Sequence, residues 1–305
     1  MSAPSAVTPR SSARGRLAAA AVLVTLLIPV GDATATFPGR NGKIAFVSTH
    51  DGGSAVWTVD PDGRDPRQLT PRFASAYGVS FSGDGRRIAF RACSRHSSWC
   101  GIYVMSAEGR QLRRVAHTSR EGSEPGFSPD GRSIVFAAGR YLEDQRIYTI
   151  RPDGTEKRAL APGGSPTFSP DGRRIAFVRL APDPKGTHFA NSDLHVMDRD
   201  GGRVRRLTSN PASERDPAFS PDGRRIAFTA GGYSGFDAVY DMDAGGGAPR
   251  LLTNDRHLSY GPAFSPDGRL LVFSSADEVR VMNADGTRQR RIAAPGASPD
   301  WQPRR

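Results

Sequence analysis

The sequence has few of the residues on which redox, metal and hydrolase chemistry depend. Only two of its 305 residues are cysteines, and they do not have the C-x-x-C spacing of redox enzymes. The six histidines show neither H-E-x-x-H nor H-x-x-x-H spacing. The string GYSGF at 232–236 has Phe236 where a hydrolase nucleophile motif has glycine, so we interpret it as a hairpin loop. We expect no catalytic residues, no metal and no cofactor.

The sequence also lacks an apolar run long enough to cross a bilayer. Its longest run, Leu17–Val30, has about fourteen residues, against the roughly 20 that a spanning helix needs. Three arginines precede it, and the small residues of a signal-peptidase site, Ala33 and Ala35, follow it. We therefore predict a cleaved signal peptide over residues 1–35 and an exported protein, periplasmic or extracellular, with no stable membrane span after cleavage. An uncleaved anchor is the alternative.

Aromatic residues are not interleaved with the basic ones, which argues against a nucleic-acid surface. The net charge is +11, but the arginines follow the D-G turns and precede L-T pairs all along the chain. A nucleic-acid interface gathers basic residues on one surface, often with aromatic residues on which bases stack. We therefore expect no nucleic-acid partner.

A ten-residue string is present in many copies. FSPDGRRIAF occurs at 168–177 and again at 219–228, and near-copies lie at 81–90, 127–136 and 264–273. Ser-Pro-Asp-Gly is a tight turn: proline presets the first central φ, and glycine takes a backbone conformation that a Cβ would strain. The I-A-F that follows is apolar on both faces of a strand, which therefore needs neighbours on both sides.

Each repeat of about 45 residues contains four short strands, which is the organisation of a propeller blade. Six I-A-F-type strands predict six blades over residues 36–305. The N-terminal part has a second strand without a first, and the C-terminal S-P-D-W has a first strand without a second. Pairing them closes the ring and removes both sheet edges. We expect an all-β, six-bladed propeller of four-stranded antiparallel blades, and a monomer.

The combined pattern P-x-F-S-P-D-G-x-x-I-A-F, I-Y-x-M, D-G and R-x-L-T resembles the WD-like repeat of the TolB-type six-bladed β-propellers. The resemblance covers residues 37–303. It implies the propeller fold, but this fold supports many functions, so the resemblance alone does not identify an activity.

Cys93 and Cys100 flank a loop between the second and third strands of one blade. In an exported protein this arrangement predicts a disulfide, and two buried thiols are the alternative. His195 lies in L-H-V-M, at the position that Tyr103 and Tyr148 occupy in other repeats, so we expect it to pack as an aromatic residue.

The irregular segments of the repeat all fall at one end of the predicted ring, the loop-rich face, where binding residues commonly lie. Three positions before each innermost-strand Phe or Trp, at the channel mouth on that face, are Gly78, Glu124, Ser165, Asp216, Gly261 and Ser298. Two acids among small residues are unexpected in a basic protein, although surface solvation alone also explains them. Tyr260 is expected to add an aromatic wall, so Glu124, Asp216, Tyr260 and Ser165 are the candidate binding residues.

The sequence predicts a non-catalytic exported propeller that binds a protein, peptide or cell-envelope partner through its loop-rich face. The alternative is a hydrolase or lyase that acts on polysaccharide or peptide, with Glu124 and Asp216 as acid and base. A purely structural scaffold is the third possibility.

Overall fold

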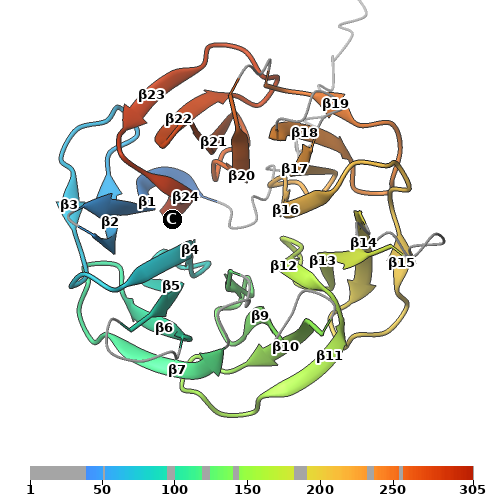
Figure 1. Ribbon diagram of the computed structural model, residues 1–305, viewed down its shortest axis with the longest axis horizontal. Coiled ribbons are helices and arrows are strands. Elements are labelled where there is room, and N and C mark those ends of the chain that lie inside the picture. Colours follow the sequence, from blue (N-terminus) through green and yellow to red (C-terminus); the bar gives the residue numbers. More distant parts are fainter. Residues whose placement is uncertain are drawn as a thin grey trace, which may run out of the picture. The chain divides into compact units, whose positions relative to one another are not determined.

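The computed structural model describes residues 39–50, 52–94, 100–118, 124–139, 144–181, 191–231, 237–253 and 257–304. The predicted signal peptide and the GYSGF segment lie outside these residues. The described part of the chain folds into twenty-four strands in six four-stranded antiparallel sheets, with no helix. It therefore offers no helix that could span a membrane. The sheets form the blades of a ring (Figure 1).

The two inner strands of each blade come from the P-x-F and I-A-F segments. The innermost strands are β24 (Ala297–Arg304), β4 (Ser75–Phe81), β8 (Gly126–Phe127), β12 (Gly164–Phe168), β16 (Glu214–Phe219) and β20 (Ser259–Phe264). The second strands are β1 (Arg40–His50), β5 (Arg87–Cys93), β9 (Ile134–Ala138), β13 (Arg174–Leu180), β17 (Arg225–Gly231) and β21 (Leu270–Ser275).

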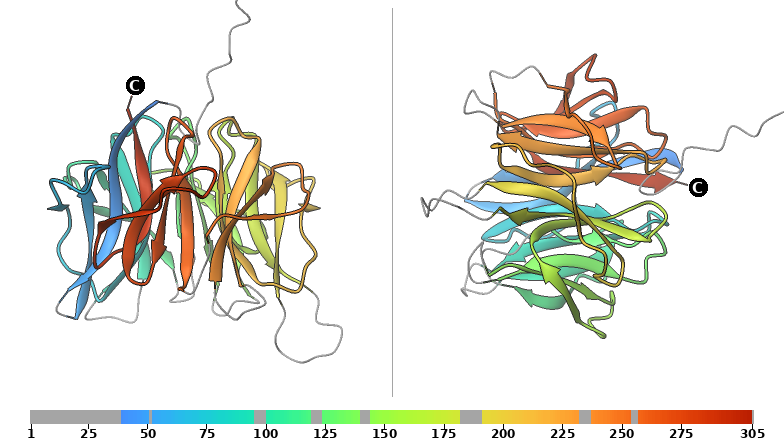
Figure 2. Two further views of the ribbon diagram at one scale, coloured as in Figure 1. Left: turned by 90° about the horizontal axis from the view of Figure 1, so that it is seen from above. Right: turned by 90° about the vertical axis from the view of Figure 1, so that its right-hand side faces the viewer.

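The two outer strands carry the I-Y-x-M and R-x-L-T segments, and they run between the two faces of the ring (Figure 2). The third strands are β2 (Gly53–Val59), β6 (Cys100–Ser106), β10 (Arg146–Ile150), β14 (Ser192–Asp198), β18 (Asp237–Asp243) and β22 (Glu278–Asn283). The outermost strands are β3 (Arg67–Gln68), β7 (Arg113–Thr118), β11 (Arg158–Pro162), β15 (Arg205–Arg206), β19 (Arg250–Leu251) and β23 (Arg290–Ala293).

The second strand of each blade is buried on both faces, as its composition predicts. Ile175, Ala176 and Phe177 are all 0% exposed. Phe177 packs on His195 of β14, with ring centroids 5.5 Å apart, as Phe90 packs on Tyr103 at 5.6 Å. His195 is buried, which lowers its pKa below the ordinary value. The prediction that His195 packs as an aromatic residue is confirmed.

The S-P-D-G turns and the D-G turns of the outer strands lie at the end of the ring opposite the loop-rich face. We call this end the turn face. The Gly223 N–H donates to the Ser220 carbonyl (2.8 Å), and Gly223 has φ +67°. The Asp222 carboxylate accepts from the Ser220 hydroxyl (2.6 Å) and from the Arg224 N–H (3.0 Å). Burial opposes ionisation of Asp222, but these hydrogen bonds hold its pKa below the ordinary value.

The first blade contains both ends of the described chain, and this confirms the predicted closure. Its strand order is β24-β1-β2-β3, and β1 pairs with β24 through Ile44↔Trp301 and Ala45↔Asp300. Trp301 is 2% exposed and packs in a cluster with Ile44 and Phe46. The last strand therefore completes both the first sheet and its hydrophobic core.

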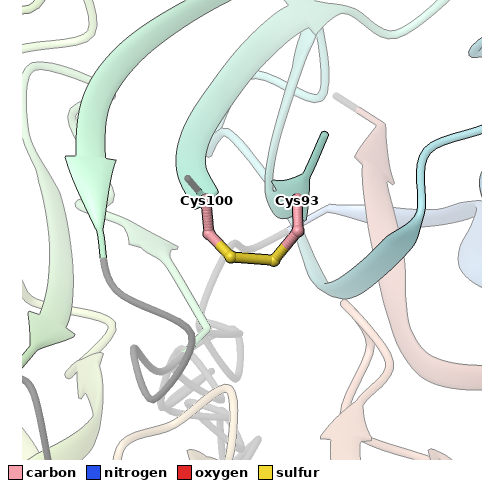
Figure 3. Close-up of a disulfide and its surroundings, with 2 residues drawn as sticks. All are labelled: Cys93 and Cys100. Atoms are coloured by element: carbon pink, nitrogen blue, oxygen red, sulfur yellow. A yellow bond between two sulfur atoms is a disulfide. The ribbon is translucent and has the colours of Figure 1, made fainter. Parts of the chain in front are cut away.

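The two cysteines form the predicted disulfide (Figure 3). Cys93 is the last residue of β5, and Cys100 is the first of β6, and the two are register partners with Cα atoms 4.0 Å apart. The bond therefore fastens the end of a hairpin on the loop-rich face.

Candidate functional site at the channel mouth

The residues of the predicted channel mouth share an unusual backbone. Five of the six have positive φ: Gly78 (+50°), Ser165 (+45°), Asp216 (+53°), Gly261 (+61°) and Ser298 (+50°). Each lies at or beside an irregularity in the pairing of the innermost strand with the second strand. This conformation is costly for residues with a Cβ, and strained residues of this kind cluster at functional sites. The bulges turn the mouth residues out of the regular ladder.

The innermost strands surround a central channel. Five of the six mouth residues line it, and prolines and small residues make up much of the remaining wall. Its lining includes three carboxylates, those of Glu124, Asp216 and Asp300, but no lysine, arginine or histidine from the described residues. In a protein of net charge +11, this separation of charge makes the channel a favourable place for a cationic group.

Glu124 reaches across the mouth. A Cβ added to Gly78 would lie 2.2 Å from the Cβ of Glu124, so the glutamate side chain covers Gly78 and keeps that residue out of the channel lining. The Ser298 hydroxyl donates to Glu124 Oε1 over 3.0 Å. Burial, and secondly the negative charge of Asp216, raise the pKa of Glu124 to about 7. Glu124 and Asp216 therefore lie close enough to influence each other.

Asp216 is held by residues from its own and the neighbouring blades. Its Oδ2 accepts a hydrogen bond from the Thr229 hydroxyl (3.3 Å), and Arg215 Nε lies 3.8 Å away. Thr229 in turn accepts from the Gly261 N–H over 3.0 Å. Burial raises the pKa of Asp216 despite the opposing charge of Arg215 and hydrogen bonds from Thr229 and Ser165. Ser165 therefore both hydrogen-bonds to Asp216 and lines the channel.

Tyr260 is half-buried beside the mouth rather than in the channel wall, to which its neighbour Gly261 belongs. Burial raises its pKa, with further contributions from the charges of Asp277, Glu124 and Asp216. The structure therefore brings together Glu124, Ser165 and Asp216 in the channel wall, with Tyr260 within electrostatic range of both acids.

Three supporting residues of the mouth were not predicted from the sequence. They are Arg91, Thr229 and Ser274, and each directly follows the I-A-F-type phenylalanine of its second strand. Arg91 is 5% exposed and lies 5.0 Å from the centre of the Tyr77 ring, and its charge opposes the rise in the pKa of Glu124. Ser274 Oγ accepts from the Ser298 N–H over 2.9 Å. The sequence does distinguish these three residues, because they are polar where the other blades carry the apolar residues Val47, Ala137 and Val178.

Asp300 is a third channel acid, and it is not among the candidate residues predicted from the sequence. It accepts a hydrogen bond from the Phe81 N–H over 2.7 Å, and burial raises its pKa to about 7. The corresponding position, two residues after each mouth residue, carries only small residues elsewhere: Ser80, Gly126, Thr167, Ala218 and Ala263. That contrast was the signal by which it could have been found.

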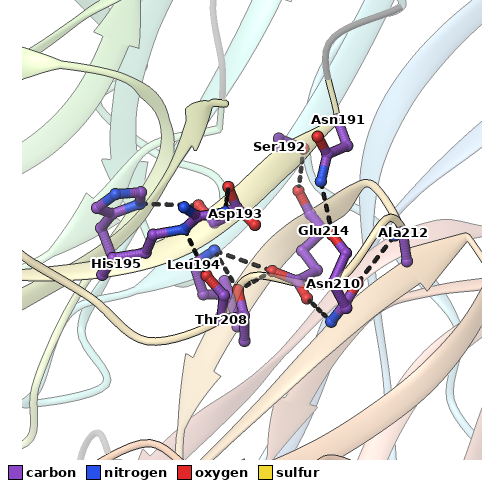
Figure 4. A network of polar contacts seen from close by, with 10 residues as sticks. Asn191, Ser192, Asp193, Leu194, His195, Thr208, Asn210, Ala212 and Glu214 are labelled. Atoms are coloured by element: carbon purple, nitrogen blue, oxygen red, sulfur yellow. Dashed lines mark hydrogen bonds and ion pairs between the residues drawn. The ribbon is translucent and has the colours of Figure 1, made fainter. Parts of the chain in front are cut away.

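A second group of buried polar residues is structural (Figure 4). The Glu214 carboxylate, which is 0% exposed, accepts from the Leu194 N–H (2.9 Å) and from Asn210 Nδ2 (2.7 Å), and the Thr208 hydroxyl also donates to it. These contacts fasten the crossing between two blades to β14. The described residues contain no group of three or more His, Cys, Asp or Glu placed to hold a metal ion.

Six four-stranded antiparallel blades around a channel define a six-bladed β-propeller. Residues 161–304 match the family described as TolB beta propeller domain. The match and the fold together confirm the resemblance to TolB-type β-propellers that the repeats predict. No curated protein sequence matches the chain.

Solved structures of several functions share the fold. TolB from Acinetobacter baumannii is 21% identical, with a TM-score of 0.70, over 88% of this chain and 68% of that one. The tricorn protease is 19% identical, with a TM-score of 0.64, over 83% of this chain and 26% of that one. Kuenenia stuttgartiensis hydrazine synthase is 15% identical, with a TM-score of 0.70, over 90% of this chain and 49% of that one. At these identities the similarity establishes the fold alone.

Proposed function

We propose that this chain is an exported, non-catalytic binding module that engages a protein, peptide or cell-envelope partner through its loop-rich face. The observation that carries the proposal is the channel mouth, where Glu124 and Asp216 lie together in a cavity whose described lining has no basic residue. Two carboxylates in a narrow, partly desolvated opening favour a cationic group on the partner. A lysine or arginine side chain meets this requirement.

Two further features support binding at this face. Tyr77 and Tyr260 occupy the same repeat position in blades on either side of the first blade, directly before Gly78 and Gly261. Tyr77 is 44% exposed, so it offers an aromatic surface next to the acids. Aromatic rings attract cations and provide contact area at low entropic cost. The disulfide of Cys93 and Cys100 suits an oxidising compartment, which supports export.

The test is a pull-down from the native envelope fraction, followed by affinity measurements on the partner that it identifies. We expect the double substitution Glu124→Gln and Asp216→Asn to weaken binding about tenfold or more, because a desolvated charge on the partner loses its counter-charges. High salt should weaken binding of the unsubstituted protein in the same direction.

The matched control is Asp62→Asn with Glu108→Gln, two exposed acids on the turn face that change the net charge by the same amount. This control should bind the partner like the unsubstituted protein. Equal affinity of both double variants would mean that the mouth acids only solvate the surface and that the partner binds elsewhere.

A catalytic role is the second candidate, as a hydrolase or lyase that uses the mouth carboxylates. The observation that favours it is the raised pKa of Glu124, about 7, beside a second acid. Glycosidases use one protonated and one ionised carboxylate in this way. Product formation from a glycan or peptide substrate that Glu124→Gln abolishes would replace the binding proposal with this one.

A further inference from the structure

A basic hollow lies on the turn face between the blade β8–β11 and the blade β12–β15, whose positions Figure 1 shows. Five basic side chains line it: Arg132, Arg151, Lys157, Arg158 and Arg199. Only two carboxylates accompany them, those of Asp130 and Glu156, together with the hydroxyls of Ser133 and Thr149. The lining therefore carries three positive charges in excess.

Ser133, which lines the hollow, departs from the repeat. In the other blades this position holds Lys43, Arg87, Arg174, Arg225 and Leu270. Arg87 shows what the long side chain does: it lies 5.2 Å from the Phe127 ring centre and donates to the Gly131 carbonyl (2.8 Å) of the next blade. Ser133 is too short to reach the equivalent ring, that of Phe168, and Arg199 of the next blade lies 5.7 Å from the centre of that ring instead.

Three of the basic residues are also departures from the repeat. Arg199 stands where the other blades have Pro61, Ala107, Pro152, Ala244 and Ala284. Arg151 stands where they have Asp60, Ser106, Asp198, Asp243 and Asn283. Lys157 stands where they have Pro66, Leu112, Val204, Pro249 and Gln289. Four departures from the repeat, in two blades, thus line this one hollow, and three of them add positive charge to it.

The charges of the hollow are only partly neutralised. Arg151 pairs with Glu156 (3.0 Å), and Arg199 pairs with Asp130 (3.4 Å) and reaches Ser133 Oγ (3.3 Å). Within the described part of the chain, Arg132, Lys157 and Arg158 have no ion-pair partner. Like charges held close together repel, so their accumulation is best explained by an anionic ligand that neutralises them.

We propose that the basic hollow binds the phosphate groups of an anionic ligand, either a free phosphorylated molecule or a phosphate-containing polymer. Planar guanidinium groups donate two parallel hydrogen bonds to a phosphate, and lysine adds a point charge. Three excess positive charges suit a ligand with at least two negative charges better than a single carboxylate. The site lies on the opposite face from the channel mouth, so it is independent of the proposed function.

The test is calorimetric titration of the full chain at low salt with inorganic pyrophosphate and with polyphosphate. Ser133→Leu introduces the residue that the sixth blade carries as Leu270, so it should fold normally while it takes up space in the hollow without adding charge, and it should weaken binding about tenfold or more. Arg199→Ala removes a charge without filling the space, and it should weaken binding several-fold. Binding of both probes indicates a free phosphorylated ligand, and binding of polyphosphate alone indicates a polymer.

The matched control is Arg224→Ala, to be compared with Arg132→Ala. Both residues are exposed, follow an S-P-D-G turn and change the charge equally, but only Arg132 lines the hollow. Only Arg132→Ala should weaken binding. The proposal is overturned if neither probe binds, if Ser133→Leu binds normally, if Arg132→Ala and Arg224→Ala weaken binding equally, or if citrate binds in place of the phosphates.

Discussion

The Ser298 hydroxyl donates a 3.0 Å hydrogen bond to Glu124 across the channel mouth, although 174 positions separate the two residues in the sequence. Ser298 belongs to β24 of the first blade, and Glu124 leads into β8 of the third. The blade between them contributes Gly78, over which the glutamate lies. The position of Glu124 therefore depends on three blades at once.

Gly78→Ala tests this arrangement. The substitution places a Cβ 2.2 Å from that of Glu124 and forces alanine into φ +50°. We expect a loss of about 2–4 kcal/mol in the free energy of unfolding, from backbone strain and displacement of Glu124. Gly261→Ala is the control, because its φ is +61° but nothing lies within 4 Å of the added Cβ. It should lose only about 1 kcal/mol. Equal losses in urea denaturation would show that Glu124 does not press on Gly78.

The pH dependence of stability should change in Glu124→Gln. The pKa of Glu124 is about 7 in the folded protein against an ordinary 4.5, so the stability that it contributes is complete below pH 4.5 and is lost as pH rises through 7. Glutamine does not titrate. The free energy of unfolding of the variant, relative to that of the unsubstituted protein, should therefore rise by about 1–2 kcal/mol between pH 5 and pH 8. This amount is smaller than the full pKa shift implies because solvent reaches Glu124.

Denaturation at four pH values in this range measures the difference. Glu108→Gln, an exposed substitution on the turn face, should keep a constant difference from the unsubstituted protein. A constant difference for Glu124→Gln as well would show that Glu124 is already ionised at pH 5.

Removal of residues 298–303 should open the ring. The deletion takes away the pairs Ile44↔Trp301 and Ala45↔Asp300 and exposes an edge of β1. We expect the thermal midpoint to fall sharply. Trp301→Ala is the milder variant, and it should cost about 3–5 kcal/mol because the indole is almost fully buried. Melting of the deletion variant at the temperature of the complete chain would contradict closure by β24.

The disulfide predicts a simple chemical result. Denatured, unreduced protein should contain no reactive thiol, because Cys93 and Cys100 are the only cysteines. Their double replacement by alanine should cost up to about 2.5 kcal/mol by the loop-entropy relation. Two thiols per chain in a colorimetric assay would mean that the pair is reduced in the folded protein.

The ring could be predicted from the sequence because its determinants are local and repeated. Each I-A-F strand shows by its composition that both its faces are buried, and each S-P-D-G shows a turn. The complementary ends then specified closure. Repeat position also located the mouth residues, because counting back from each Phe or Trp reaches the same point of every blade.

What the sequence could not supply is contact across the ring. Glu124 covers Gly78 of the second blade and accepts from Ser298 of the first only after the three blades have packed side by side, and no local pattern encodes these contacts. The basic hollow is similar, since Ser133 and Arg199 belong to different blades and meet only after the blades have packed. Asp300 differs from the small residues at its repeat position, but only the packed ring shows that its carboxylate enters the channel.

Closure by β24 also has a consequence for the order of assembly. The second to sixth blades each form from one continuous segment, whereas the first also needs β24, which follows all the other strands in the sequence. Bringing together partners as distant as Ala45 and Asp300 carries a large entropic cost, so it should be a late and slow step. Until then β1 has one free backbone edge that can pair with another chain. The nascent protein is therefore most prone to aggregation before β24 has paired with β1.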